Sequence, residues 1–152
     1  MLSDGVISLR NTTPEELPAI VRMEADDDAA DFVTQQSVEE HQSNLRDPEL
    51  VYKSIYDGHE ALIGFIYLAL DPDAESVELR RIVVDPKGKG YGRRAMALAE
   101  RVCREEIGRR RIWLDVFDFN ARAQRVYERC DYRQFKTGEL DGKPLLFYEK
   151  LV

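Results

Sequence analysis

The chain has 152 residues, of which 43% are hydrophobic and 34% are charged, as is typical of one globular domain, here residues 1–152. Its net charge of −7 argues against nucleic-acid binding, which needs a basic surface; it is compatible with a cationic substrate and equally with solubility alone. Two cysteines are too few for a disulfide framework, and we expect a cytoplasmic protein with reduced thiols. With neither a signal peptide nor a long apolar run, no membrane association is expected.

The first half of the chain predicts one strand, two helices and three further strands. Capping boxes formed by Thr13 with Glu16 and by Ser37 with Glu40 start the two helices. The strands are expected at residues 6–9, 50–56, 61–70 and 77–84, with a turn at Asp57-Gly58 between the second and third.

The second half predicts alternating helices and strands, followed by a hairpin. The expected elements are a helix over residues 90–107 ended by Gly108, a strand over 112–117, a helix over 120–130, and strands over 132–136 and 144–151 joined at Asp141-Gly142. Three consecutive strands favour an antiparallel meander, and the later strand-helix-strand segments favour a parallel portion. We therefore predict an α+β fold with a mixed sheet rather than a doubly wound one.

A glycine-rich loop at residues 87–92 lies between a predicted strand and a predicted helix. Its three glycines allow close backbone approach to a ligand, and the free N–H groups at the helix start favour an anion. Gly92 is followed by Arg93-Arg94, so the loop lacks the hydroxyl of a Walker A motif and the third glycine of a dinucleotide fingerprint. The pattern predicts a phosphate site; the alternative is a tight turn with solvated lysines.

Asn120 and Tyr127 are seven residues apart and therefore share a helix face. A tyrosine has a reference pKa near 10 and is protonated at neutral pH, so Tyr127 could donate a proton to a leaving thiolate. Asn120 could bind an amide group of an extended ligand. The alternative is a core tyrosine and a helix-capping asparagine.

Glu78 lies on the strand that leads into the glycine loop. With a period of two, Glu78, Arg80, Ile82 and Val84 are expected on one face. A carboxylate there could take a proton from a substrate ammonium, directly or through water. The alternative is an ion pair with Arg80 or Arg81.

Residues 78–95 resemble the acyl-CoA-binding motif of the GNAT family of N-acetyltransferases, and residues 111–127 resemble its second motif. The similarity is close over residues 78–132 and is greatest to the subgroup of ribosomal-protein and spermidine acetyltransferases. It implies a central mixed, mostly antiparallel sheet flanked by about four helices. It also implies direct transfer of acetyl from acetyl-CoA to an amine in a ternary complex, without a metal.

The resemblance assigns roles to individual positions. Tyr127 matches the general acid and Glu78 the base of some members, while others use a different residue or a water chain. The loop matches the segment that wraps the CoA pyrophosphate, and residues 82–84 match the strand that pairs with pantetheine. The implied cofactor-binding residues are Ile82, Val83, Val84, Lys87, Gly88, Lys89, Gly90, Tyr91, Gly92, Arg93, Asn120 and Ala123. Two departures are Asp131-Tyr132 where the family often has Gly-Phe, and Lys87 where many members have Arg or Gln.

The acceptor is not determined by these motifs. Acidic residues of the early region could attract a polyamine, a basic peptide terminus or an aminoglycoside, or could be a solvated helix end: Glu24, Asp26, Asp27, Asp28, Asp31, Glu39 and Glu40. His41 and His59 have no metal-ligand spacing and are expected at the surface or in loops. A small amine or polyamine is the favoured acceptor; the alternatives are a protein terminus or lysine, and a non-catalytic acyl-CoA-binding module. The resemblance is also compatible with a homodimer.

Overall fold

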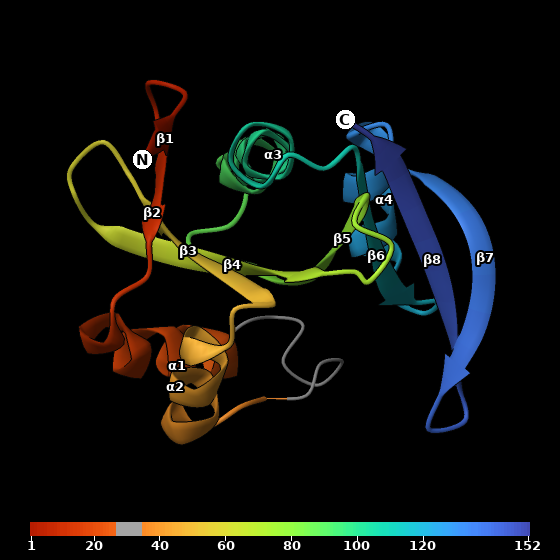
Figure 1. Ribbon diagram of the computed structural model, residues 1–152, viewed down its shortest axis with the longest axis horizontal. Helices are drawn as coiled ribbons and strands as arrows, with labels where there is room; N and C mark the ends of the chain where they lie inside the picture. Colours follow the sequence, from red (N-terminus) through yellow and green to blue (C-terminus); the bar gives the residue numbers. More distant parts are fainter. Residues whose placement is uncertain (27–34) are drawn as a thin grey trace.

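The computed structural model describes residues 1–26 and 35–152, which form one eight-stranded sheet with helices on both faces (Figure 1). The strands are β1 (Leu2–Ser3), β2 (Ser8–Asn11), β3 (Leu50–Tyr56), β4 (Leu62–Leu70), β5 (Ser76–Val84), β6 (Arg111–Phe117), β7 (Arg133–Leu140) and β8 (Lys143–Leu151). The helices are the 3₁₀ turn η1 (Pro14–Glu16), α1 (Leu17–Asp26), α2 (Val38–Arg46), α3 (Tyr91–Arg101) with its π-helical continuation η3 (Val102–Ile107), and α4 (Ala121–Arg129).

The strand order is β1-β2-β3-β4-β5-β6-β8-β7. Strands β3, β4 and β5 form the predicted antiparallel meander, and β5 and β6 form the parallel portion. Strand β8 inserts between β6 and β7 and is antiparallel to both. The mixed, mostly antiparallel α+β sheet is therefore confirmed. The sequence missed the two-residue β1, and the first long strand begins at Ser8 instead of Val6.

Local sequence signals explain several element ends. The Ser37 hydroxyl accepts a hydrogen bond from Glu40 N and the Glu40 carboxylate accepts one from Ser37 N, which confirms the second capping box. Asp141 and Gly142 have φ of 53° and 77° and join β7 directly to β8, as expected for a tight hairpin turn. Gly108 ends the long helix in the left-handed conformation, as predicted.

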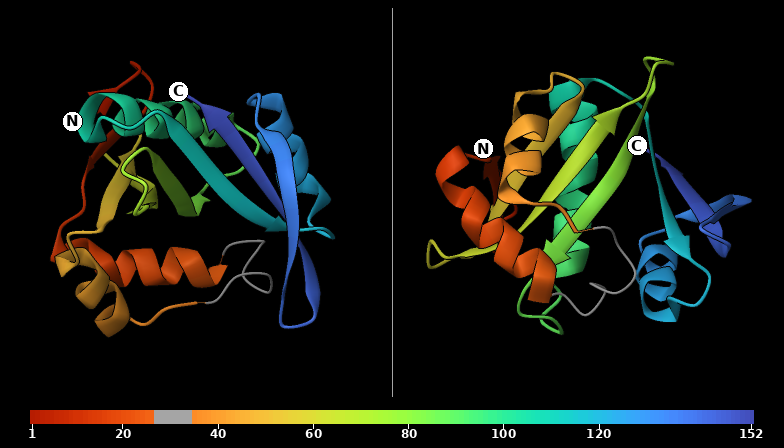
Figure 2. Two further views of the ribbon diagram at one scale, coloured as in Figure 1. Left: turned by 45° about the vertical axis from the view of Figure 1, so that its right-hand side comes forward. Right: turned by 90° about the horizontal axis from the view of Figure 1, so that it is seen from below.

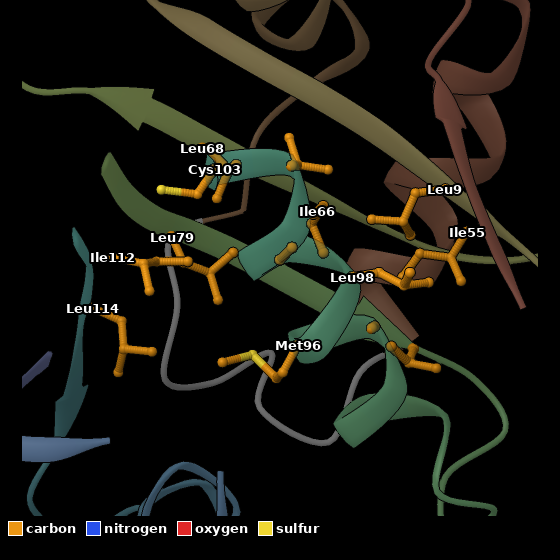
Figure 3. Packing of buried hydrophobic residues seen from close by; sticks show 14 of the residues in the cluster. Leu9, Ile55, Ile66, Leu68, Leu79, Met96, Leu98, Cys103, Ile112 and Leu114 are labelled. Atoms are coloured by element: carbon orange, nitrogen blue, oxygen red, sulfur yellow. The ribbon is translucent and has the colours of Figure 1, made fainter. Parts of the chain in front are cut away.

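Each face of the sheet has its own apolar core. Helix α3 packs on one face through its apolar residues, and Figure 3 shows Met96 and Leu98 of that helix among the side chains of Ile66 and Leu79. Helices α1 and α2 cover the other face of β3, β4 and β5, where Leu17 and the aromatic residues of the sheet form a second core (Figure 2).

A β-bulge interrupts β5 and changes which of its residues share a face. Tyr67 of β4 pairs with Arg81 whereas Leu68 pairs with Leu79, so Arg80 is the extra residue. Beyond the bulge, Ile82 and Val84 pack on the α3 side with Leu79, while Val83 packs on the α1 side. The prediction that Glu78 shares a face with Ile82 and Val84 is therefore wrong, because one inserted residue reverses the alternation.

Candidate active site

Strands β5 and β6 pair only at their beginnings. The paired positions are Ser76–Arg111, Val77–Ile112 and Glu78–Trp113, although β5 continues to Val84 and β6 to Phe117. Figure 2 (right) shows the two strands diverging toward their carboxyl ends. One edge of residues 79–84 pairs with β4, and within the described part of the chain no strand pairs with the other edge. An extended ligand could add to that edge as a further strand.

The two helices that follow these strands begin at the same edge of the sheet. Because β5 and β6 are parallel, their carboxyl ends point to the same edge of the sheet, where the chain passes from β5 into α3 and from β6 into α4. The Arg93 guanidinium of α3 lies near the Cys130 thiol at the end of α4 and lowers its pKa, although burial raises that pKa overall. The glycine loop and α4 are thus brought together.

The glycine loop leaves open space at all three glycines. A Cβ added at Gly88, Gly90 or Gly92 would meet no heavy atom within 4 Å, and the first two have φ of +81° and +78°. Gly90 is the N-cap of α3, and Tyr91 is the first helical residue. An anion could therefore approach the exposed N–H groups of the helix start without displacing a side chain.

The basic residues around this loop have different surroundings. Lys89 and Arg93 are exposed. The Lys87 ammonium donates a hydrogen bond to Val84 O over 3.1 Å. Arg94 forms an ion pair with Asp4, at 2.9 Å between Nη1 and Oδ2. Lys89 and Arg93 are consequently the cations best placed to meet a phosphate.

Residues 82–84 lie between β4 and the unpaired edge of β5. They pair with Ile66, Phe65 and Gly64 in turn. A Cβ at Gly64 would collide with the carbonyl oxygen of Val83, so this glycine allows β4 to approach the end of β5. Gly64 was not among the predicted site residues; its signal in the sequence is a lone glycine inside a strand.

Asn120 and Tyr127 lie on α4 as expected, but their observed contacts match the structural alternative. Asn120 caps the helix, its Oδ1 accepting a hydrogen bond from Ala123 N over 3.3 Å. Tyr127 is half-buried against the α3-side core, with its ring centroid 6.3 Å from that of Tyr132 and 6.4 Å from that of Tyr148. Ala123 packs against the same core. These contacts position α4 against the sheet. The roles of Tyr127 as general acid and of Asn120 in cofactor binding stay predictions.

Glu78 occupies the last paired position of β5, where the strands begin to diverge. Its carboxylate accepts a hydrogen bond from Arg80 Nε over 2.9 Å, and its side chain is 18% exposed. The alternative interpretation of Glu78, an ion pair with Arg80, is therefore confirmed. Arg80 reaches Glu78 from the bulge, which the sequence did not reveal.

Among the early acidic residues that the structure describes, Glu24 differs from Asp26, Glu39 and Glu40 in being buried. Glu24 is buried, with its carboxylate 2.9 Å from Arg81 Nη1 and 3.3 Å from His41 Nε2. Burial opposes the charge of Glu24, but hydrogen bonds from His41 and Gln36 N and the charge of Arg81 leave its pKa lowered. Two interpretations of Glu24 are therefore wrong. It belongs neither to an acidic surface cluster that attracts the acceptor nor to a solvated helix end.

His41 is also fully buried, contrary to the expected surface or loop position. Its Nδ1 lies 2.8 Å from Tyr52 Oη. His59 is exposed in the β3–β4 turn, as expected, and Asp26, Glu39 and Glu40 are exposed. Asp27, Asp28 and Asp31 lie outside the described residues.

The sequence departure at Asp131 is accommodated in the backbone. Asp131 adopts the left-handed conformation, with φ of 70°. The next residue, Tyr132, donates its N–H to Tyr127 O over 3.0 Å and ends α4. Asp131 therefore takes the conformation that a glycine would adopt more readily.

Residues 14–132 match the model of the acetyltransferase (GNAT) family. The chain therefore belongs to the GNAT family and is an N-acetyltransferase, which confirms the family and enzyme class expected from the two motifs. No curated protein matches the chain significantly. No helix among the described residues is long and apolar enough to cross a membrane, and those residues contain no group of three or more side chains suited to a metal ion.

Solved structures of a spermidine N-acetyltransferase from Vibrio cholerae share the fold. The complex of that enzyme with CoA and spermine has a TM-score of 0.83 at 20% identity, covering 97% of this chain and 96% of the other. Its dodecameric form in an intermediate state has a TM-score of 0.78 at 19% identity, with coverage of 97% and 95%. A complex with manganese ions has a TM-score of 0.77 at 19% identity, with coverage of 96% and 92%.

The open space at Gly90 predicts the effect of a side chain there. We expect Gly90→Val to weaken CoA binding more than about tenfold, because the new side chain would occupy the approach to the helix start. Calorimetric titration with CoA measures the change. Gly108→Val is the matched control: Gly108 has the same φ of +78° and the same open surroundings, so both variants carry similar backbone strain. Equal losses in the two variants would mean that the loop is not the phosphate site.

Proposed function

We propose that the protein transfers acetyl from acetyl-CoA to a primary amine by direct attack in a ternary complex, with a small amine or polyamine as acceptor. The observation that carries this proposal is the end of β5–β6 pairing at Glu78 and Trp113, next to an open glycine loop. An acyl-CoA needs both features, because its diphosphate requires an anion site and its extended arm requires a free strand edge.

The residues around the strand divergence fit such a co-substrate. The backbone of the loop would hold the diphosphate, with Lys89 and Arg93 neutralising its charge. The free edge of β5 would hold the pantetheine arm, and a backbone N–H there would polarise the thioester carbonyl. The proposed binding residues are Ile82, Val83, Val84, Lys87, Gly88, Lys89, Gly90, Tyr91, Gly92, Arg93, Asn120 and Ala123.

In the proposed reaction, the acceptor nitrogen attacks the thioester carbon as the C–S bond breaks. One proton of the acceptor ammonium first passes to Glu78, directly or through water, and the departing sulfur takes a proton from Tyr127. The second proton, which the nitrogen loses as the amide forms, passes through water to the Tyr127 phenolate and restores the phenol, and Glu78 releases its proton to solvent. Arg80 holds the Glu78 carboxylate in place. Each proton has a donor and an acceptor, and no bond to the enzyme forms.

The state of the cysteines supports direct attack. Burial raises the pKa of the Cys103 thiol to about 11. Burial also raises the pKa of Cys130, against the opposing effect of Arg93. Because the thiolate is the reactive form, neither residue is suited to carry the acetyl group as an enzyme thioester.

The favoured acceptor class rests on charge and on the structural neighbours. A net charge of −7 attracts a polycation better than a neutral amine, and one neighbour of this fold was solved with CoA and spermine. We propose a polyamine-like acceptor, with the ribosomal-protein and spermidine acetyltransferase subgroup as the nearest functional group. A peptide amine remains the second candidate.

We further propose that the protein acts in the cytoplasm, where Cys103 and Cys130 stay reduced, without a nucleic acid, membrane or metal partner. Self-association as a homodimer is also part of the proposal. The edge strand β7 supports it, because all eight of its residues are exposed and Phe135 and Leu140 are among them.

An acceptor screen with purified protein and a thiol-release readout tests the function. We expect acetyl-CoA-dependent release with at least one polyamine and slower release with monoamines. Turnover of basic peptides alone would support the second candidate. CoA binding without release for any acceptor would identify a non-catalytic binding module.

Removal of the Tyr127 hydroxyl tests the proposed acid. We expect Tyr127→Phe to lower kcat by about 100-fold, the lower range for a general acid, with CoA affinity nearly unchanged. Steady-state kinetics and calorimetry give the two values. Tyr148→Phe is the control, because it removes a hydroxyl from a neighbouring ring of the same aromatic group. Unchanged kcat in Tyr127→Phe would exclude Tyr127 as the acid.

Neutralising Glu78 tests the proposed base. Glu78→Gln should lower kcat by about 100-fold or more, because the base is removed. It should also flatten the acidic limb of the pH–rate profile, because the variant has no carboxylate at this position whose protonation could lower the rate. The measurement is kcat from pH 5 to 9 with saturating acceptor. A full acidic limb in the variant would assign the proton to another group.

A further inference from the structure

Asp115 lies beside the proposed reaction centre but has no role in the mechanism above. It follows Trp113, the last residue of β6 that pairs with β5, by two positions, so both side chains are on the same face of the strand. The intervening Leu114 is buried in the α3-side core. Asp115 therefore lies on the opposite face, just beyond the point where the two strands diverge.

The Asp115 carboxylate differs from its neighbours in having no partner in the part of the chain that the structure describes. Glu78 is paired with Arg80 and Glu149 with Arg111, and Asp71 accepts a hydrogen bond from Trp113 Nε1. Within residues 1–26 and 35–152, no hydrogen bond or ion pair reaches the carboxylate of Asp115, whose side chain is partly desolvated by its neighbours but remains accessible to solvent. Asp115 is available to an incoming group.

The surroundings of Asp115 favour a cation. Glu78 contributes a second negative charge from β5, whereas Arg80 from the same strand opposes it. On β8, Phe147 is the register partner of Asp115. The ammonium of Lys136 on β7 lies 4.5 Å from the centre of the Phe147 ring, so a cation of the protein itself already occupies this ring face.

The same neighbours determine how Asp115 titrates. Partial burial and then the negative charge of Glu78 raise the pKa of Asp115, and Arg80 acts in the opposite direction. Asp115 is therefore neutralised at a higher pH than an ordinary aspartate. Any cation that it binds is held above this pKa and released as the pH falls through it.

We propose that Asp115 binds an ammonium group of the acceptor and so determines which amines are used. The inference rests on the proposed acetyl transfer and adds the residue that holds the acceptor. A carboxylate with no partner among the described residues, near the Glu78 carboxylate where β5 and β6 diverge, is suited to a protonated amine. An acceptor with two or more ammonium groups would place one at Asp115 while another loses its proton to Glu78.

The test measures equilibrium binding of spermidine and of propylamine to the CoA-saturated protein by calorimetry. We expect Asp115→Asn to weaken spermidine binding by about 10- to 100-fold at pH 7.5, because a charge-assisted contact is lost. Asp115→Glu should restore most of the affinity. Asp141→Asn is the control, since it removes the same charge from a β-turn where asparagine fits the backbone.

Two further readouts separate binding from a structural role. Spermidine affinity of the unmodified protein should fall on acidification through the raised pKa of Asp115, and this dependence should be weaker in Asp115→Asn. In steady-state assays the same variant should raise the KM for spermidine while kcat and CoA affinity change little.

The outcomes distinguish this inference from the proposed function. Acetylation of spermidine with unchanged affinity in Asp115→Asn would overturn the role of Asp115 and leave the activity intact. Absence of binding of both amines to the CoA-saturated protein would also overturn it. Asp115-dependent spermidine binding without thiol release for any acceptor would instead remove the proposed activity and leave the binding site in place.

Discussion

The short parallel pairing of β5 with β6 is the constraint on which the site depends. It joins the antiparallel strands β1–β5 to the antiparallel group β6, β8 and β7, and it ends after Glu78 and Trp113. The bulge at Arg80 follows two residues later, and a bulge bends its strand and increases its twist. One inserted residue thus accounts for the separation of the strands and supplies the guanidinium that holds Glu78.

The rest of the site follows from the direction of these two strands. Parallel strands direct their carboxyl ends to the same edge of the sheet, so the starts of α3 and α4 lie at that edge. The glycine loop and the capped start of α4 then flank the free edge of β5. On the other face of the sheet, α1 and α2 cover β3, β4 and β5, while Trp113 and Asp115 lie on β6 beyond them.

Features set by local chemistry were predictable from the sequence. The Ser37 capping box, the Asp141-Gly142 turn and the open glycine loop depend on residues that are neighbours in the chain. The bulge at Arg80 was not predictable, because it depends on the register with β4. Nor was the burial of Glu24, because its partner Arg81 is distant in sequence and the negative charge alone suggested an exposed position. Asp115 was not predicted as a site residue, because an aspartate that alternates with apolar residues in a strand is expected simply to face solvent. Only the divergence of β5 from β6, which the sequence does not show, places Asp115 beside the proposed reaction centre.

The Glu24–Arg81 ion pair has a consequence for how the two substrates affect each other. A buried pair adds little net stability after desolvation, but this one joins α1 to the residue immediately before Ile82. If acetyl-CoA binds along that edge and the acceptor binds on the α1 face, both ligands act on a single strand. A ligand that displaced α1 would then change the affinity for the other ligand, and by thermodynamic necessity such cooperativity would be reciprocal.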